Sequence, residues 1–184
     1  MVGKDHDQEP TGRRAVDSGV NRGTSVEADW LRFQDAAQRY CAVIDSVGEM
    51  QDSVDLYAAI AVPLADLYAA GRRLSVVNTS DDDFEVEELS HDAWRGIFEA
   101  IDRLTGDADP YRTVFDPQED SEVVEAALAD DLADIYRDVL PAVRWNDPVH
   151  LNDLLFELWM SFQGHWARHA LEAMRVIHWR HPYW

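Results

Sequence analysis

The chain has 184 residues, a length that suits one domain with its own hydrophobic core and no need of disulfide bonds. Its 36 acidic and 16 basic residues give a formal net charge of −20, which excludes nonspecific binding to nucleic acid or anionic membranes and favours a basic protein as a partner. No run approaches the roughly 18 apolar residues of a membrane span and no signal peptide is evident, so we expect a cytoplasmic protein.

The first 25 residues differ from the rest of the chain in composition. They hold glycine, proline, serine, threonine and scattered charges without a periodic apolar pattern, so residues 1–25 are predicted to be a disordered N-terminal arm. Basic and acidic residues balance within this arm. The excess of negative charge therefore belongs to the predicted helical domain, residues 26–184.

Two helices are expected in the first half of this domain. Apolar residues at helical spacing predict one helix over residues 26–47 and a second over residues 51–73, which Gly71 should end. Pro63 falls inside the second helix and is expected to kink or break it near residues 59–62. Cys41, the single cysteine, lies among apolar positions of the first helix and is predicted to be an inert buried thiol.

The middle of the chain is predicted to alternate loops with helices. The acidic stretch 81–88 has no apolar stripe and indicates an exposed loop. Ser90 can cap a helix that ends at Gly106. The turn-rich segment 107–117 is predicted to be a loop that packs back onto the bundle, and a further helix over residues 121–140 should end before Pro141.

The longest helix-compatible stretch is residues 152–181. With an advance of 100° per residue, its apolar arc centres on Leu158 and is interrupted by His165, His169 and Glu172. The opposite side is also apolar, so this helix is predicted to be central in the bundle. No alternating pattern typical of strands extends beyond residues 83–89. The prediction is a single all-α bundle of five to six helices with a long central C-terminal helix.

Three aspartates interrupt the predicted fourth helix on its inward side. Asp131, Asp134 and Asp138 lie along the edge of the core, whereas Asp130 is expected to point outward. Buried carboxylates are costly unless they are paired or bound to metal, so these three need partners. The candidate partners are the arginines, tyrosines and inward histidines of the bundle: Arg137, Arg168, Arg175, Arg180, Tyr40, Tyr57, Tyr68, Tyr111, His165 and His169.

The inward histidines, His165 and His169, are four residues apart, a spacing that lets two imidazoles on one helical face bind one metal ion. With Glu172 and the three aspartates they form the candidate cluster for a metal site or a polar core. The pattern is weaker than HExxH, because Trp166 follows His165 where that motif has a glutamate. The preferred interpretation is a hydrogen-bonded core network, with less than about a tenth of an equivalent of zinc, iron or manganese bound. A metal site is the alternative.

Two function classes follow from these features. The preferred one is a non-catalytic protein-interaction module with an acidic surface, a basic partner and no cofactor. The alternative is a metal-binding helical protein of the His/Asp/Glu type, for which hydrolysis is a reaction to consider. Trp179, Tyr183 and Trp184 favour an interface near the C-terminus, through which a homodimer could form. Nothing in the sequence specifies a reaction, so whether the chain is an enzyme is left open.

Three stretches carry a resemblance to a known family. They read YCAVID at residues 40–45, LADDLADIYRD at residues 128–138 and HWARHALEAMRVIH at residues 165–178. Together they resemble the bacterial family catalogued as domain of unknown function 5063, over roughly residues 30–178. The resemblance implies a small helical bacterial protein. It brings no established activity, cofactor or catalytic residue.

Overall fold

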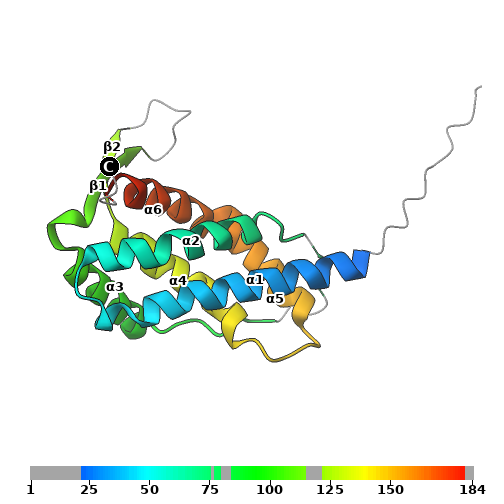
Figure 1. The fold of residues 1–184 in the computed structure, drawn as a ribbon. Helices are drawn as coiled ribbons and strands as arrows, with labels where there is room; N and C mark the ends of the chain where they lie inside the picture. The colour runs from blue at the N-terminus through cyan, green and yellow to red at the C-terminus, as the bar shows by residue number, and fades with distance from the viewer. Residues whose placement is uncertain (1–21, 76, 80–83, 115–121, 181–184) are drawn as a thin grey trace, which may run out of the picture.

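The protein is a helical bundle with one small β-hairpin (Figure 1). A computed structural model describes residues 22–75, 77–79, 84–114 and 122–180. The α-helices are α1 (Arg22–Asp45), α2 (Ser53–Gly71), α3 (His91–Thr105), α4 (Leu128–Arg144), α5 (Leu151–Ser161) and α6 (Ala167–Arg180). Shorter elements are the 3-10 turns η1 (Val47–Glu49) and η2 (Gly106–Ala108), the π turn η3 (Phe162–Trp166), and the antiparallel strands β1 (Pro110–Val114) and β2 (Val123–Ala127). The all-α prediction is confirmed, with the hairpin as an addition.

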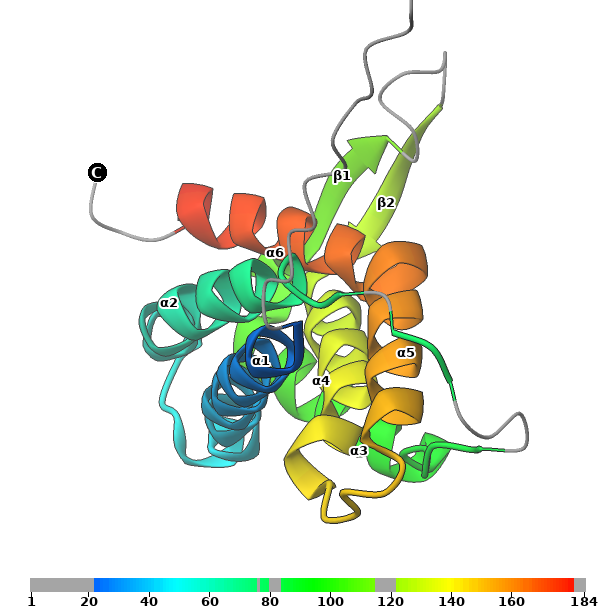
Figure 2. The same ribbon diagram turned by 90° about the vertical axis from the view of Figure 1, so that its right-hand side faces the viewer.

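Helix α4 is the most enclosed helix of the bundle. It contacts α1, α3, α5 and α6, and Figure 2 shows it between α1 and α5. The predicted C-terminal helix is also present, as α5, η3 and α6 in one continuous segment. That segment keeps an exposed side, on which Met160 and Leu171 are about half exposed. The central place in the bundle therefore belongs to α4.

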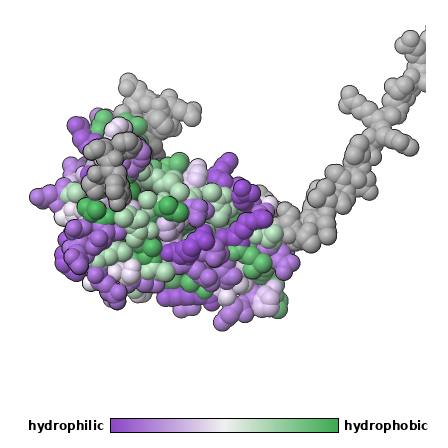
Figure 3. Space-filling model, viewed as in Figure 1, coloured by the Kyte–Doolittle hydropathy of each residue, from purple (hydrophilic) through white to green (hydrophobic). Residues whose placement is uncertain are grey.

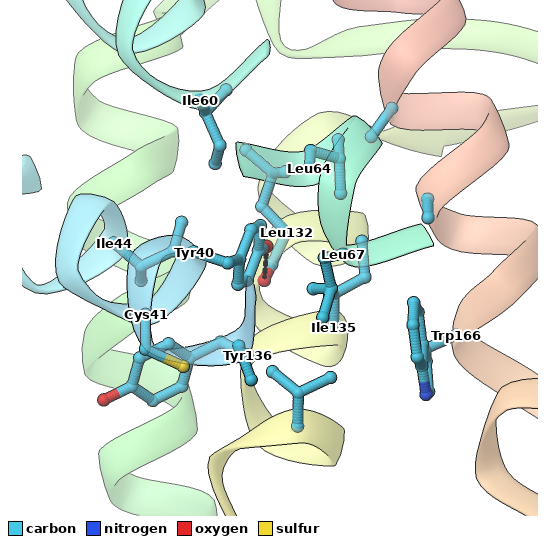
Figure 4. Close-up of a cluster of buried hydrophobic side chains, with 14 of the residues drawn as sticks. Tyr40, Cys41, Ile44, Ile60, Leu64, Leu67, Leu132, Ile135, Tyr136 and Trp166 are labelled. Atoms are coloured by element: carbon cyan, nitrogen blue, oxygen red, sulfur yellow. Dashed lines mark hydrogen bonds between the residues drawn. The ribbon is translucent and has the colours of Figure 1, made fainter. Parts of the chain in front are cut away.

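The apolar core lies where α1, α2 and α4 meet (Figure 4). The Tyr40 hydroxyl is fully buried there and donates a hydrogen bond of 2.8 Å to the Leu132 carbonyl, which satisfies the phenol inside an apolar environment. Burial raises the pKa of the neighbouring Cys41 thiol to about 12. A thiol with such a pKa stays protonated and unreactive, as predicted.

Helix α2 runs through Pro63 as one helix, so of the expected kink or break near residues 59–62 the break is absent. Its N-terminus is capped by Asp52, which accepts hydrogen bonds from two backbone amides, and it ends at Gly71 as predicted. By length and composition α2 could cross a membrane, although the core helix of a soluble protein passes the same test. Its buried side chains here belong to the bundle core: Leu56, Tyr57, Ile60, Leu64 and Leu67.

Helix α4 differs from its prediction at both ends. It begins at Leu128 because residues 123–127 pair with β1 as a strand. Asp109 fixes this start: its carboxylate accepts the Ala129 amide at 2.8 Å and its carbonyl accepts the Leu128 amide at 3.2 Å. Pro141 lies inside the helix, which continues to Arg144. The expected stop at Pro141 was wrong, because one missing amide donor does not outweigh the packing of the buried residues around it.

Segments outside the helices also differ from expectation. Helix α1 begins at Arg22, inside the predicted arm, and the rest of that arm lies outside the described residues, as do Tyr183 and Trp184. The part of the predicted exposed loop 81–88 that the structure describes, residues 84–88, carries partly buried apolar residues that pack against the core, Phe84 and Val86, whereas residues 81–83 lie outside the described residues. One face of the molecule is shown in Figure 3, where hydrophilic residues cover most of the surface and smaller apolar patches lie among them.

Candidate metal centre

Five polar side chains meet between α4 and the η3–α6 segment. Asp131, Asp134 and Asp138 come from one face of α4, and His165 and His169 come from η3 and α6. We call these five residues the Asp–His cluster. The side chains of Asp131, Asp134, Asp138 and His169 are no more than 12% exposed, whereas that of His165 is 37% exposed. The cluster is therefore a buried polar layer with one accessible end at His165.

Each histidine uses its Nδ1 atom against an outer aspartate. His165 Nδ1 lies 2.8 Å from Asp138 Oδ2, and His169 Nδ1 lies 2.7 Å from Asp131 Oδ1. A carboxylate at this distance holds the proton of a neutral imidazole on Nδ1. The lone pair of each ring is then on Nε2.

The two Nε2 atoms converge on the central aspartate. His165 Nε2 is 3.6 Å and His169 Nε2 is 3.8 Å from the same atom, Asp134 Oδ2. Both distances exceed those of N–H···O hydrogen bonds. One potential ligand atom from each of these three residues lies within 4.8 Å of the other two. Three acceptor atoms thus surround one point.

The other oxygen of Asp134 is already occupied. Asp134 Oδ1 accepts a hydrogen bond of 2.9 Å from the Trp94 indole and an ion-pair contact of 3.0 Å from Arg137 Nη2. Arg137 was a predicted partner, whereas Trp94 was not among the predicted partners. A signal was present in the sequence, because a buried indole N–H usually finds a polar partner.

Hydroxyl groups hold the outer aspartates. The Tyr111 hydroxyl donates to Asp131 Oδ2 at 2.5 Å and the Ser161 hydroxyl donates to Asp138 Oδ2 at 2.5 Å. Each side of the cluster is therefore a hydroxyl–carboxylate–imidazole chain that ends at Asp134. Ser161 faces a carboxylate and not an imidazole, so this contact does not activate it as a nucleophile.

The two chains differ in their electrostatics. The hydrogen bond to Asp138 raises the pKa of His165. Burial opposes the ionisation of Asp138, but hydrogen bonds from His165 and Ser161 outweigh it and lower the pKa of this carboxyl. Burial dominates at Asp131, where the pKa is raised although His169 and Tyr111 both donate to the carboxyl. Burial and hydrogen bonding thus shift the pKa values of the two outer carboxyls in opposite directions.

The π turn η3 carries His165. Its first and last residues, Phe162 and Trp166, have buried rings that meet edge to face with centroids 4.7 Å apart. A π turn holds one more residue than an α turn and is frequent at functional sites. The His165 and His169 rings that flank its end are 4.8 Å apart.

Not every predicted residue joins the cluster. Glu172 accepts hydrogen bonds from Thr113 at 3.0 Å and from Arg175 at 2.7 Å, which ties α6 to β1. Asp130, expected to point outward, is half-buried and lines a cavity of about 190 Å³ that also borders His169. Of the predicted partners, the structure brings Arg137, Tyr111 and both histidines to the aspartates.

A larger cavity, of about 580 Å³, borders the His165 end of the cluster. Trp94, Arg137, Asp138, Ser161 and His165 all line it, so both groups that hold Asp134 Oδ1 reach this space. The cluster consequently lies between two cavities, with its exposed imidazole facing the larger one.

Comparison with known proteins gives a fold and a family. Protein BF1032 from Bacteroides fragilis, known from a crystal structure, has a similar fold, with a TM-score of 0.68 and 19% sequence identity over 80% of this chain and 89% of that chain. At this identity the similarity concerns the fold alone. No curated protein matches the sequence. The model of the family Domain of unknown function (DUF5063) matches residues 25–181, and the chain therefore belongs to that family.

Proposed function

We propose that the protein binds one divalent transition-metal ion through Asp134 Oδ2, His165 Nε2 and His169 Nε2. The observation that carries the proposal is the convergence of these three acceptor atoms while the other polar atom of each side chain is occupied. Carboxylates behind the histidines orient the rings and raise their basicity, as they do in many metal sites.

The spacing of the ligand atoms suits a metal ion after a small contraction. A tetrahedral ion with bonds of about 2.0–2.1 Å holds its ligand atoms about 3.3 Å apart. The two nitrogen–oxygen distances to Asp134 Oδ2 are 3.6 and 3.8 Å. Two imidazoles and one carboxylate suit zinc or iron(II), and three protein ligands leave a position for water or a small molecule.

A metal-free network explains the same contacts less well. If Asp134 Oδ2 received N–H groups from both histidines, these distances should be about 2.7–3.2 Å. They are 3.6 and 3.8 Å. The sequence alone favours a protein without metal, and that remains a prediction; the geometry of the cluster favours the alternative.

The test is a titration of tag-free, chelator-treated protein with Zn²⁺. We expect close to one equivalent to bind and the melting temperature to rise. The variant His165→Ala/His169→Ala should lose this binding, whereas His178→Ala, which removes an exposed histidine of α6, should keep it. Circular dichroism shows whether each variant is folded, and Asp134→Asn removes a ligand while it preserves side-chain volume. Binding of less than about a tenth of an equivalent by the folded wild type would refute the proposal.

A second candidate, interaction with a basic protein, rests on the net charge of −20. Long-range attraction between opposite charges weakens with ionic strength. Any specific partner should therefore be basic, and its capture should fall as salt rises from about 50 to 300 mM. Salt-insensitive capture would count against this candidate.

A further inference from the structure

The 580 Å³ cavity opens to solvent and is bordered by three stretches of the chain, residues 86–94, 137–141 and 157–165. Its inner end is the accessible side of the Asp–His cluster, with Arg137 and His165. Its walls come from residues 86–94, which include the first turn of α3, from the C-terminal half of α4 and from α5. A volume of this size falls within the range of about 300–1,000 Å³ that small-molecule sites have.

The charge at the inner end depends on the ion. Without metal, Arg137 faces the carboxylates of Asp134 and Asp138, so this group of three has an excess of negative charge. A bound divalent cation is the largest local charge and reverses that sign. An anion would then find two cationic neighbours, the ion and the Arg137 guanidinium.

Part of the wall is apolar and aromatic. Val86, Leu89, Pro141 and Leu158 line the cavity together with the Trp94 indole. This indole is held by stacked contacts with His91 and Phe98, whose ring centroids lie 5.7 and 5.6 Å away. A rigid indole offers a flat surface for an aromatic or aliphatic group.

Two acidic residues, Glu88 and Glu157, also line the cavity and are exposed. Their charges disfavour ligands with several negative charges, because like charges repel in a confined space. A ligand with one negative charge suits the cationic inner end without strong repulsion from the two glutamates, and an apolar body suits the apolar part of the wall.

We propose that the cavity binds a monoanionic carboxylate with an apolar, ring-sized body. The carboxylate contacts the open position of the metal ion and the Arg137 guanidinium, and the body lies against Trp94 and the apolar wall. This proposal rests on the metal site proposed above, which supplies one of the two cationic contacts.

The test compares three probes on protein loaded with Co²⁺, whose visible absorption reports changes in its ligands. Benzoate has the charge and the body, benzyl alcohol has the body alone, and inorganic phosphate has the charge alone. We expect benzoate to bind with one-to-one stoichiometry, to change the Co²⁺ spectrum and to bind at least about tenfold more tightly than either control. Metal-free protein should show no comparable binding of benzoate.

A variant in the wall separates the cavity from the metal ligands. Leu89→Trp narrows the cavity at its wall, and Leu89 is not part of the Asp–His cluster, so Co²⁺ should still bind while benzoate affinity falls at least about tenfold. Leu171→Trp, at an exposed position of α6, is the matched control and should leave benzoate affinity unchanged.

The outcomes test the metal site and the ligand assignment separately. If Co²⁺ binds but benzoate is no tighter than benzyl alcohol, or phosphate is tighter than benzoate, the ligand assignment is overturned and the metal site stands. If Co²⁺ and Zn²⁺ both fail to bind to folded protein, the metal site fails and the ligand assignment fails with it.

Discussion

Helix α4 has two buried faces, and burial changes the stability of the protein in opposite directions on them. Toward α1 and α2 it presents fully buried apolar residues such as Leu132 and Ile135, which gain stability from the removal of hydrocarbon from water (Figure 4). Toward α6 it presents Asp131, Asp134 and Asp138, whose desolvation costs free energy that hydrogen bonds and ion pairs must offset. An apolar face would be enough for folding. The polar face is therefore where a function is to be sought.

The largest effect is expected on the apolar face. Leu132→Ala removes a fully buried side chain from the centre of the core and should lower the free energy of unfolding by about 2–5 kcal/mol. Urea denaturation measures this loss. The metal content of the protein that remains folded should not change, and a loss below about 1 kcal/mol would contradict the larger contribution assigned to the apolar face.

The polar face should respond less in stability. Asp131→Ala leaves the Tyr111 hydroxyl and His169 Nδ1 without their acceptor, so we expect a loss of about 1–3 kcal/mol. Asp102→Ala, at an exposed position of α3, is the control and should change stability by no more than about 0.5 kcal/mol. Thermal melting compares the two variants. Equal melting temperatures would contradict the role of Asp131 in the network.

Gly71 links the apolar core to the Asp–His cluster, because it lies against the rings of Phe162 and Trp166, the first and last residues of the π turn η3. A Cβ atom at this position would be 2.6 Å from the Phe162 ring and 2.8 Å from the Trp166 ring. Gly71→Ala should therefore destabilise the fold by about 1–3 kcal/mol through overpacking, and weaken Zn²⁺ binding as η3 shifts. Denaturation and Zn²⁺ titration measure the two effects.

Gly96→Ala is the matched control for Gly71→Ala. A Cβ atom at Gly96 meets nothing within 4 Å, and this glycine lies inside α3. The substitution should stabilise the protein by about 0.5–1 kcal/mol, since alanine is the better helix former. A loss of stability in both variants would point to backbone conformation as the cause, and not to crowding at η3.

The smallest effect is expected at Asp109, which supports the start of α4. Burial raises the pKa of this carboxyl above its ordinary value of 3.8. A group whose pKa is raised by folding stabilises the fold fully below its unfolded pKa and loses that contribution as pH rises through the folded pKa. The charged form at pH 7 is thus the less favourable one.

Asp109→Asn keeps an acceptor for the Ala129 amide and the Thr105 hydroxyl but carries no charge. The variant should melt slightly above the wild type at pH 7, and the difference should shrink as the pH falls toward 4. Calorimetry at several pH values measures it. A difference that stays constant with pH would contradict the role assigned to the buried charge.

The periodicity of the apolar residues predicted most of the helices and the inward direction of the three aspartates and two histidines, because each of these properties is local to one helix. The hairpin was missed. Its second strand, Val123–Ala127, is rich in alanine and valine and continues into α4 without a turn signal, so the sequence reads as helix. Its pairing with residues 110–114 is a tertiary contact that local propensity does not contain.

The contacts that complete the cluster were predictable only in part. A helical wheel advances 100° per residue and cannot show the extra residue of η3. Trp94 and Asp134 are separated by 40 residues, and their hydrogen bond depends on how α3 packs against α4. The types of group needed around buried carboxylates were clear from the sequence, while the residues that supply them depended on the packing of the helices.

The hydrogen bond from Trp94 to Asp134 makes tryptophan fluorescence a reporter of the Asp–His cluster. The chain has seven tryptophans, but the indole of Trp94 donates directly, at 2.9 Å, to a proposed ligand carboxylate. A cation on Asp134 Oδ2 would withdraw electron density from Oδ1 and weaken this bond, which alters the surroundings of the excited indole. Subtracting the fluorescence change of a Trp94→Phe variant from that of the wild type isolates the signal of this one residue. Occupancy of the cluster can then be followed in real time, in dilute solution and without a label.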